Sequence, residues 1–172
     1  SGKIDASFPW VAGGFPLTAQ PASPAMHITQ HTDYALRVLI YLAVNEGRLA
    51  TVQEIAERFG ISRSHLMKVV NGLIHGGWVE GVRGKGGGLR LARAPSAIAV
   101  GEVVRGMEGD FHLVECFAEG SQCLLTPNCR LQGAFQGALT AFLAVLDGVT
   151  LADVAGKAQS QMLRTVQLVR RG

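Results

Sequence analysis

Two short amphipathic segments joined by a glycine turn constrain the fold of this chain more than any other feature. Thr51 and Glu54 have the spacing of a capping box, which predicts a helix that ends at Gly60. Ile61 and Ser62 lead into a further helix, whose apolar residues recur at helical spacing. These are Leu66, Val69, Val70, Leu73 and Ile74. Two helices joined by so tight a turn predict a helix-turn-helix.

The second of these helices also has a polar face that carries no acidic residue. Ser64, Lys68, Asn71 and His75 lie opposite the apolar stripe, and Arg63 lies in the first turn. Many amphipathic helices have such a face simply because water covers it. Here, six Lys and Arg residues and a single acid fall between positions 62 and 93, although the whole chain carries a formal charge of only +3. The local basic excess favours a recognition helix that meets phosphate.

A glycine-rich hairpin is predicted directly after this helix. Residues 78–82 and 89–91 have the pattern of two strands, and the basic residues Arg83 and Lys85 lie among the glycines between them. Such a hairpin is typical of a wing that lies along duplex DNA. A nucleotide-binding loop is excluded because neither of its glycine motifs is present. We expect contacts to double-stranded DNA from Arg63, Lys68, Arg83 and Lys85, with Ser62, Ser64 and His65 near base edges.

The remaining segments predict a mainly α-helical fold with a small β-hairpin wing. Thr32 is the expected N-cap of an apolar helix that continues to Val44, with Asp33 in its first turn. A long apolar stripe from Leu131 to Leu146 predicts a dimerisation helix, although the same stripe is also suited to packing on its own winged domain. Thr150 and Asp153 have the spacing of a further helix cap.

These elements divide the chain into four expected parts. Residues 1–25 lack periodicity and contain four of the six prolines, so we expect an expression remnant or a disordered extension before a natural start at Met26. Residues 26–94 form the winged helix-turn-helix, 95–130 a linker helix and cysteine loop, and 131–172 the dimerisation helix and C-terminal segment. No apolar run is as long as a membrane span and no signal peptide is evident, which predicts a cytoplasmic protein.

All three cysteines of the chain lie in one loop. Cys116, Cys123 and Cys129 have the spacing C-x6-C-x5-C, and Thr126-Pro127 is expected to start a helix that places Cys129 in its first turn. Buried thiols and a disulfide are two alternatives, but core cysteines scatter along a chain and nothing indicates an oxidising compartment. Structural zinc, with His112 as fourth ligand, is the stronger competitor. Zinc sites usually contain a tight cysteine pair, however, so the spacing favours an iron–sulfur cluster.

Four motifs together resemble the Rrf-two family of winged-helix iron–sulfur transcriptional regulators. They are T-D-Y-A-L-R at 32–37, S-R-S-H at 62–65, R-G-K-G-G-G-L-R at 83–90 and the cysteine loop, and the resemblance runs from Met26 to about Ala155. It implies a homodimeric repressor rather than an enzyme, with one cluster per subunit. The implied cluster is 4Fe-4S, with 2Fe-2S as the alternative.

Within the family, the chain is most similar to the members that sense nitric oxide. The cluster-assembly branch has a histidine ligand at the position of Gln132. The nitric-oxide-sensing members instead use an aspartate that corresponds to Asp33, supplied by the partner subunit to the cluster held by Cys116, Cys123 and Cys129. The resemblance therefore implies that nitrosylation of the cluster releases operator DNA. A zinc- or thiol-based transcription factor with another signal is the alternative function.

Overall fold

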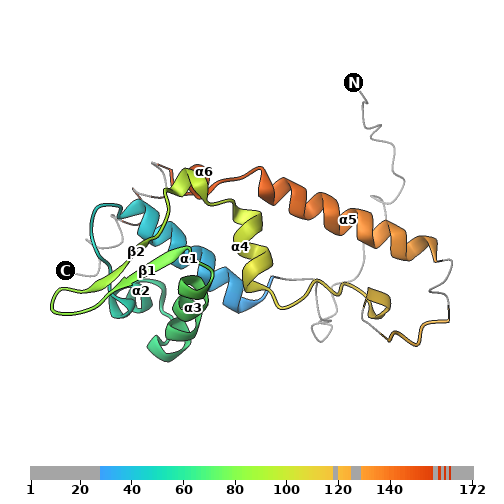
Figure 1. Cartoon of the computed structure of the whole chain (residues 1–172), viewed down its shortest axis with the longest axis horizontal. Coiled ribbons are helices and arrows are strands. Elements are labelled where there is room, and N and C mark those ends of the chain that lie inside the picture. Colours follow the sequence, from blue (N-terminus) through green and yellow to red (C-terminus); the bar gives the residue numbers. More distant parts are fainter. Residues whose placement is uncertain are drawn as a thin grey trace, which may run out of the picture.

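The computed structural model describes residues 28–117, 120–124 and 129–156, together with residues 159, 161 and 163. Its helices are α1 (Gln30–Val44), α2 (Val52–Phe59), α3 (Arg63–His75), α4 (Val100–Met107), α5 (Arg130–Asp147) and α6 (Leu151–Val154). Short 3-10 helices cover Pro95–Ala97 and Glu115–Phe117, and strands β1 (Val79–Val82) and β2 (Gly88–Leu91) pair antiparallel. Figure 1 shows α1, α2, α3 and the hairpin gathered at one end, with α5 extending away from them. The expected mainly helical fold with a β-hairpin wing is confirmed.

The helix-turn-helix forms through local hydrogen bonds. The Thr51 hydroxyl accepts from the Glu54 amide at 3.1 Å, and the Glu54 carboxylate accepts from the Thr51 amide at 3.4 Å, which confirms the capping box. Gly60 then ends α2 in the left-handed conformation (φ 66°), which side-chain-bearing residues rarely adopt. Ser62 caps α3 by accepting from the amide of His65 at 3.4 Å. This part of the fold therefore follows from residues a few positions apart.

Helix α1 begins one turn earlier than expected. The N-cap is Thr29, whose hydroxyl accepts from the amide of Thr32 at 3.3 Å, so the prediction of Thr32 as the cap is wrong. Thr32 is fully buried inside the helix, whereas Thr29 donates its amide and hydroxyl to the Glu108 carboxylate at 2.8 and 3.2 Å. The bond to a distant residue stabilises the earlier start. Asp33 remains in the first turn.

A hydrogen-bonded group connects the end of α1 to the start of α2. The hydroxyl of buried Tyr41 donates to the Glu54 carboxylate at 2.5 Å, and Arg48 donates to the same oxygen at 2.6 Å. Burial alone would raise the pKa of the Glu54 carboxyl, but the bonds from Arg48 and Tyr41 outweigh it and hold the pKa below its usual value. Burial and the bond to Glu54 raise the pKa of Tyr41. This group therefore fixes the helix-turn-helix relative to α1.

The wing is tied to the domain at both ends. Ala50 pairs with Leu89 through two backbone hydrogen bonds of 3.1 and 2.8 Å, adding a one-residue bridge to the edge of β2. Trp78, which precedes β1 and is only 4% exposed, donates its indole N–H to Glu102 on α4 at 3.0 Å. The strands differ by one residue from those expected at one end each, starting at Val79 and Gly88. The wing is therefore held from two directions.

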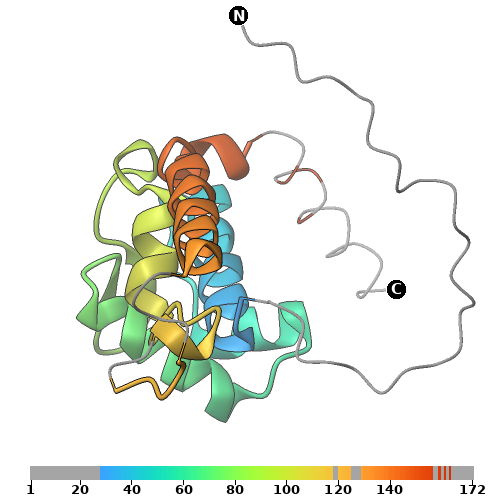
Figure 2. The same ribbon diagram turned by 90° about the vertical axis from the view of Figure 1, so that its right-hand side faces the viewer.

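Helix α5 contacts α4 but buries none of its own side chains. Arg105 of α4 forms a two-bond ion pair with Asp147, the last residue of α5, at 2.5 and 3.1 Å. Figures 1 and 2 show α5 next to α4 in both views. After it, Thr150 and Asp153 form the expected capping box, and Leu151 of α6 enters the core of the winged domain at 1% exposure. Among the described residues, no helix has both the length and the apolar character to cross a bilayer.

Candidate nucleic-acid interface and metal centre

The outward face of α3 is exposed, as the sequence predicts. Ser64, Lys68, Asn71 and His75 all lie on it, and Arg63 is exposed in the first turn. Within the described chain, neither Arg63 nor Lys68 forms a salt bridge. Cations without an internal partner are available to phosphate. This face is therefore suited to double-stranded DNA.

Two of the residues expected near base edges also have structural roles. The Ser62 hydroxyl is occupied in capping α3, and the His65 ring packs edge-on against Tyr34 of α1 with 5.2 Å between ring centroids. Ser62 is exposed, while His65 is only partly exposed. Ser64 is exposed, and its hydroxyl lies 3.5 Å from that of Ser62. Contact of all three residues with base edges stays a prediction.

The wing presents two further cations at its tip. Arg83 and Lys85 are exposed, and the turn that carries Lys85 is closed by a hydrogen bond of 2.9 Å from the amide of Gly87 to the carbonyl oxygen of Gly84. Glu80, the acid of β1, is paired with Arg90 of β2 at 3.0 Å. The carboxylate therefore does not compete with DNA for Arg83 or Lys85.

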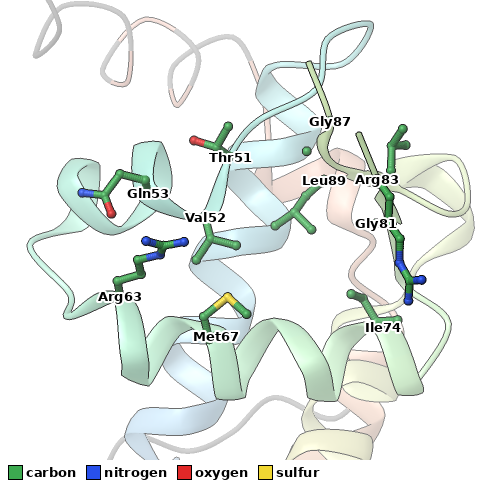
Figure 3. A pocket seen from close by; sticks show the side chains of 12 residues that line it. Thr51, Val52, Gln53, Arg63, Met67, Ile74, Gly81, Arg83, Gly87 and Leu89 are labelled. Atoms are coloured by element: carbon green, nitrogen blue, oxygen red, sulfur yellow. The ribbon is translucent and has the colours of Figure 1, made fainter. Parts of the chain in front are cut away.

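A hollow of about 420 Å³ separates α3 from the wing and the start of α2. Figure 3 shows Arg63 at one end of this hollow and Arg83 on the opposite wall, with Met67 and Ile74 on α3 between them. Met67 was not among the predicted site residues. Its spacing from Arg63 and Ile74 places all three on one helical stripe, but only the position of the wing shows that this stripe borders a hollow.

The three cysteines all lie in the segment that joins α4 to α5. All three thiols are free and partly exposed, so the disulfide alternative is not formed. Cys129 has extended backbone (φ −80°, ψ 106°) and is the N-cap of α5, so its predicted placement in the first helical turn is wrong. The helix starts only at Arg130, because Cys129 does not adopt helical dihedrals. The expected cap at Thr126-Pro127 lies outside the described residues.

A side chain of α5 holds the first cysteine close to the start of that helix. The Gln132 amide donates to the backbone carbonyl oxygen of Cys116 at 3.0 Å. Across the described part of the chain, no three His, Cys, Asp or Glu side chains are grouped closely enough to hold a metal ion. His112, the candidate zinc ligand, lies 3.6 Å from Asp110. The donor set nevertheless fits a cluster chemically, since unpaired, partly exposed thiols are the ligands that iron–sulfur centres use.

The proposed fourth ligand is engaged within its own helix. Arg37 donates two bonds to Asp33, at 2.7 and 3.2 Å, and its guanidinium carbon also lies 5.7 Å from the centroid of the Tyr34 ring. Both side chains of the pair are 45% exposed. A carboxylate with this exposure is accessible to a second chain, although ligation would have to compete with Arg37 for its oxygens.

Residues 28–157 of the chain match the Rrf2 (Rrf-two) family, which is described as an iron-dependent transcriptional regulator. The chain belongs to the Rrf2 family. It is 50% identical over 131 residues to the HTH-type transcriptional regulator NsrR of Bacillus subtilis (strain 168), covering 75% of this chain and 90% of that protein. It is 48% identical over 149 residues to NsrR of Geobacillus kaustophilus (strain HTA426), covering 86% and 100% respectively. This Rrf2 regulator also resembles the solved structure of T. potens IscR, with 29% identity and a TM-score of 0.63 over 78% of this chain and 92% of that one.

These similarities establish the general function. The chain is a DNA-binding, winged-helix transcriptional regulator similar to NsrR, and its family is not one of enzymes. The family's iron dependence also agrees with three free thiols in one segment. Because the family is described as iron-dependent, a zinc site is the weaker interpretation of the three cysteines.

Proposed function

We propose that this Rrf2 regulator is a dimeric, cytoplasmic repressor that senses nitric oxide through an iron–sulfur cluster in each subunit. The observation that carries the proposal is the set of three free thiols next to α5 in a chain about half identical to NsrR. Cys116, Cys123 and Cys129 would hold the cluster, which is 4Fe-4S in this proposal. When bound, the cluster supplies iron that reacts with nitric oxide.

The protein's own part in this mechanism is to order the cysteine segment. Among the described residues of this segment, the Gln132 side chain bonds to Cys116, and the Cys123 amide donates to the Ser121 hydroxyl at 3.3 Å. Three thiolates that bind one centre would hold Cys116, Cys123 and Cys129 at fixed positions, so that the free energy of binding would also order the segment. Loss of the centre would remove this ordering of the segment.

The surface of α5 supports a dimer. Leu131 is 62% exposed, Phe142 38% and Val145 68%, so the apolar stripe predicted for dimerisation is open to solvent along the helix. A second copy covering this stripe would remove that apolar area from water. Because α5 follows directly on Cys129 and its last residue pairs with Arg105, such a dimer would join the cysteine segment to the winged domain.

Asp33 of the partner subunit would complete the ligand set. The side chain of Asp33, at the first turn of α1, is 45% exposed, and Asp33 is not grouped with the cysteines among the described residues of one chain. A carboxylate oxygen is a harder ligand than a thiolate and matches cluster iron less well. Asp33 would therefore hold its iron less firmly than the cysteines hold theirs, which would leave that position the more accessible one to nitric oxide.

The experiment that tests this proposal measures iron, sulfide and operator affinity in parallel. The wild-type chain and its Cys116→Ala, Cys123→Ala and Cys129→Ala variants are purified without oxygen, and the visible absorbance of each is recorded. We expect each variant to lose both the cluster and specific DNA binding, and nitric oxide to release DNA from the wild type. Full operator binding by an iron-free Cys129→Ala protein would refute the sensing mechanism. A colourless wild type that contains zinc would favour the alternative function.

A mixed dimer tests the cross-subunit ligand. One chain carries Asp33→Ala and the other carries Cys129→Ala. If Asp33 acts across the dimer, one of the two sites has all of its ligands and binds a normal cluster. If it acts within its own chain, both sites are incomplete, and a mixed dimer without a normal cluster would rule out the cross-subunit arrangement.

A further inference from the structure

The exposed apolar surface of the winged domain is concentrated at one place. Among the described residues from 28 to 107, the exposed large hydrophobic residues are Met67, at 39%, and Ile74, at 41%. Both line the hollow between α3 and the wing (Figure 3). Exposed apolar side chains that gather in a hollow, rather than scatter singly, indicate a contact surface.

The charge of the same hollow indicates what it contacts. Its lining contains two arginines, Arg63 and Arg83, and no acidic residue. In the described chain neither guanidinium forms a salt bridge or a hydrogen bond. The partner that suits an apolar floor between two unpaired cations carries anionic groups and an apolar projection together. A DNA strand containing thymine has both, in its phosphates and its 5-methyl group.

The two apolar residues are not equally placed to reach a base. Ile74 lies near the end of α3 and packs beneath β1, since a Cβ built at Gly81 would lie 3.6 Å from Ile74 Cδ1. Met67 lies one turn after Arg63 on the stripe of α3 that borders the hollow, in the N-terminal half of the helix. In a helix-turn-helix, that half of the recognition helix contacts base edges.

We propose that Met67 determines part of the operator specificity by contacting the 5-methyl group of a thymine, while Arg63 and Arg83 bind phosphates beside it. The thioether is unbranched and polarisable, so it adapts to a methyl group without a hydrogen bond. The inference rests on DNA binding by the winged domain and adds one residue that distinguishes between bases. It gives the operator a required thymine in each half-site.

The test uses deoxyuridine, which lacks only the methyl group of thymine. A duplex is first selected from a randomised pool by the cluster-loaded wild-type dimer, and each thymine is then replaced singly by deoxyuridine. At one position in each half-site, loss of the methyl group should weaken binding by the wild type by about fourfold, the effect of removing one buried methyl group. Met67→Ala should bind the thymine duplex more weakly and reduce this discrimination to less than about twofold.

A second variant separates a direct contact from a general change in the hollow. Ile74→Ala removes the other apolar side chain and should keep the wild-type preference for thymine. Because Met67 is partly exposed, its substitution should leave the thermal midpoint nearly unchanged, which circular dichroism checks. The proposal is overturned if no deoxyuridine weakens wild-type binding, or if Met67→Ala discriminates as strongly as the wild type. Failure of the wild type to select any sequence is a separate outcome and would overturn DNA reading by the winged domain as well.

Discussion

The bond between Trp78 and Glu102 gives a prediction about the anchoring of the wing. One oxygen of Glu102 accepts both the indole N–H of Trp78 at 3.0 Å and a bond from Arg93 at 2.7 Å. The bond from Arg93, and then that from Trp78, lower the pKa of Glu102 despite the opposing effect of burial. The carboxylate is therefore charged at neutral pH, and two substitutions at this position separate its two bonds.

The expected magnitudes differ because the two partners differ in exposure. Trp78 is 4% exposed, so an indole N–H without its acceptor should cost about 1–3 kcal/mol. Arg93 and Glu102 are 38% and 41% exposed, which limits their ion pair to about 0.5 kcal/mol. Glu102→Gln keeps an oxygen for the indole and should cost about 0.5–1 kcal/mol, whereas Glu102→Ala should cost about 2–3 kcal/mol.

The assay is urea unfolding followed by tryptophan fluorescence. The chain has two tryptophans, so a Trp10→Phe background leaves Trp78 as the only reporter. All variants are compared at one protein concentration and one cluster content, because association and cofactor binding add to the free energy of unfolding. Arg93→Met serves as the matched control for the exposed pair alone. Equal losses for Glu102→Ala and Glu102→Gln would refute the view that the indole bond anchors the wing.

Three further predictions concern separate parts of the fold. Lys85→Ala should weaken binding to all DNA sequences and reduce the salt slope of log K by about one, and an unchanged slope would show that the wing tip does not touch phosphate. Gly101→Ala should destabilise the chain by about 1–3 kcal/mol in urea unfolding, since a Cβ there would lie 2.9 Å from the backbone nitrogen of Asp147; unchanged stability would mean that α5 shifts freely. Burial raises the pKa of Glu54, but the hydrogen bonds to its carboxylate outweigh burial and lower the pKa. The carboxylate therefore stabilises the fold fully above its unfolded-state pKa of about 4.3, and this stabilisation is lost as the pH falls through the lower folded-state pKa. The free energy of unfolding should therefore fall less steeply in acid for Glu54→Gln than for Tyr41→Phe, which keeps the carboxylate; identical pH profiles would contradict this.

Much of the winged domain was predictable because its determining interactions are local. The capping boxes at Thr51 and Thr150 and the end of α2 at Gly60 depend on residues at most three or four positions away. The exposed polar face of α3 follows from helical periodicity alone. The cysteines were likewise identifiable because they occur in one short segment, and the family comparison agrees with an iron-dependent regulator.

Other features of the fold depend on contacts between segments that are distant in the sequence. Both Thr29 and Thr32 have a side chain able to cap α1, and the bonds from Thr29 to Glu108, which is 79 positions away in the chain, accompany the earlier start. The Ala50–Leu89 bridge and the entry of Leu151 into the core have no local signature for the same reason.

The clearest division between sequence and structure concerns the DNA interface. Sequence identified Arg63 and Arg83 as basic residues near a helix and a hairpin, because charge and glycine content are visible in the chain itself. It did not show that they face one hollow with Met67 exposed between them. The position of a hairpin against a helix depends on contacts between residues far apart in the sequence. Here those contacts are made by Ala50 and Trp78. A short stretch of sequence does not show which distant residues will meet.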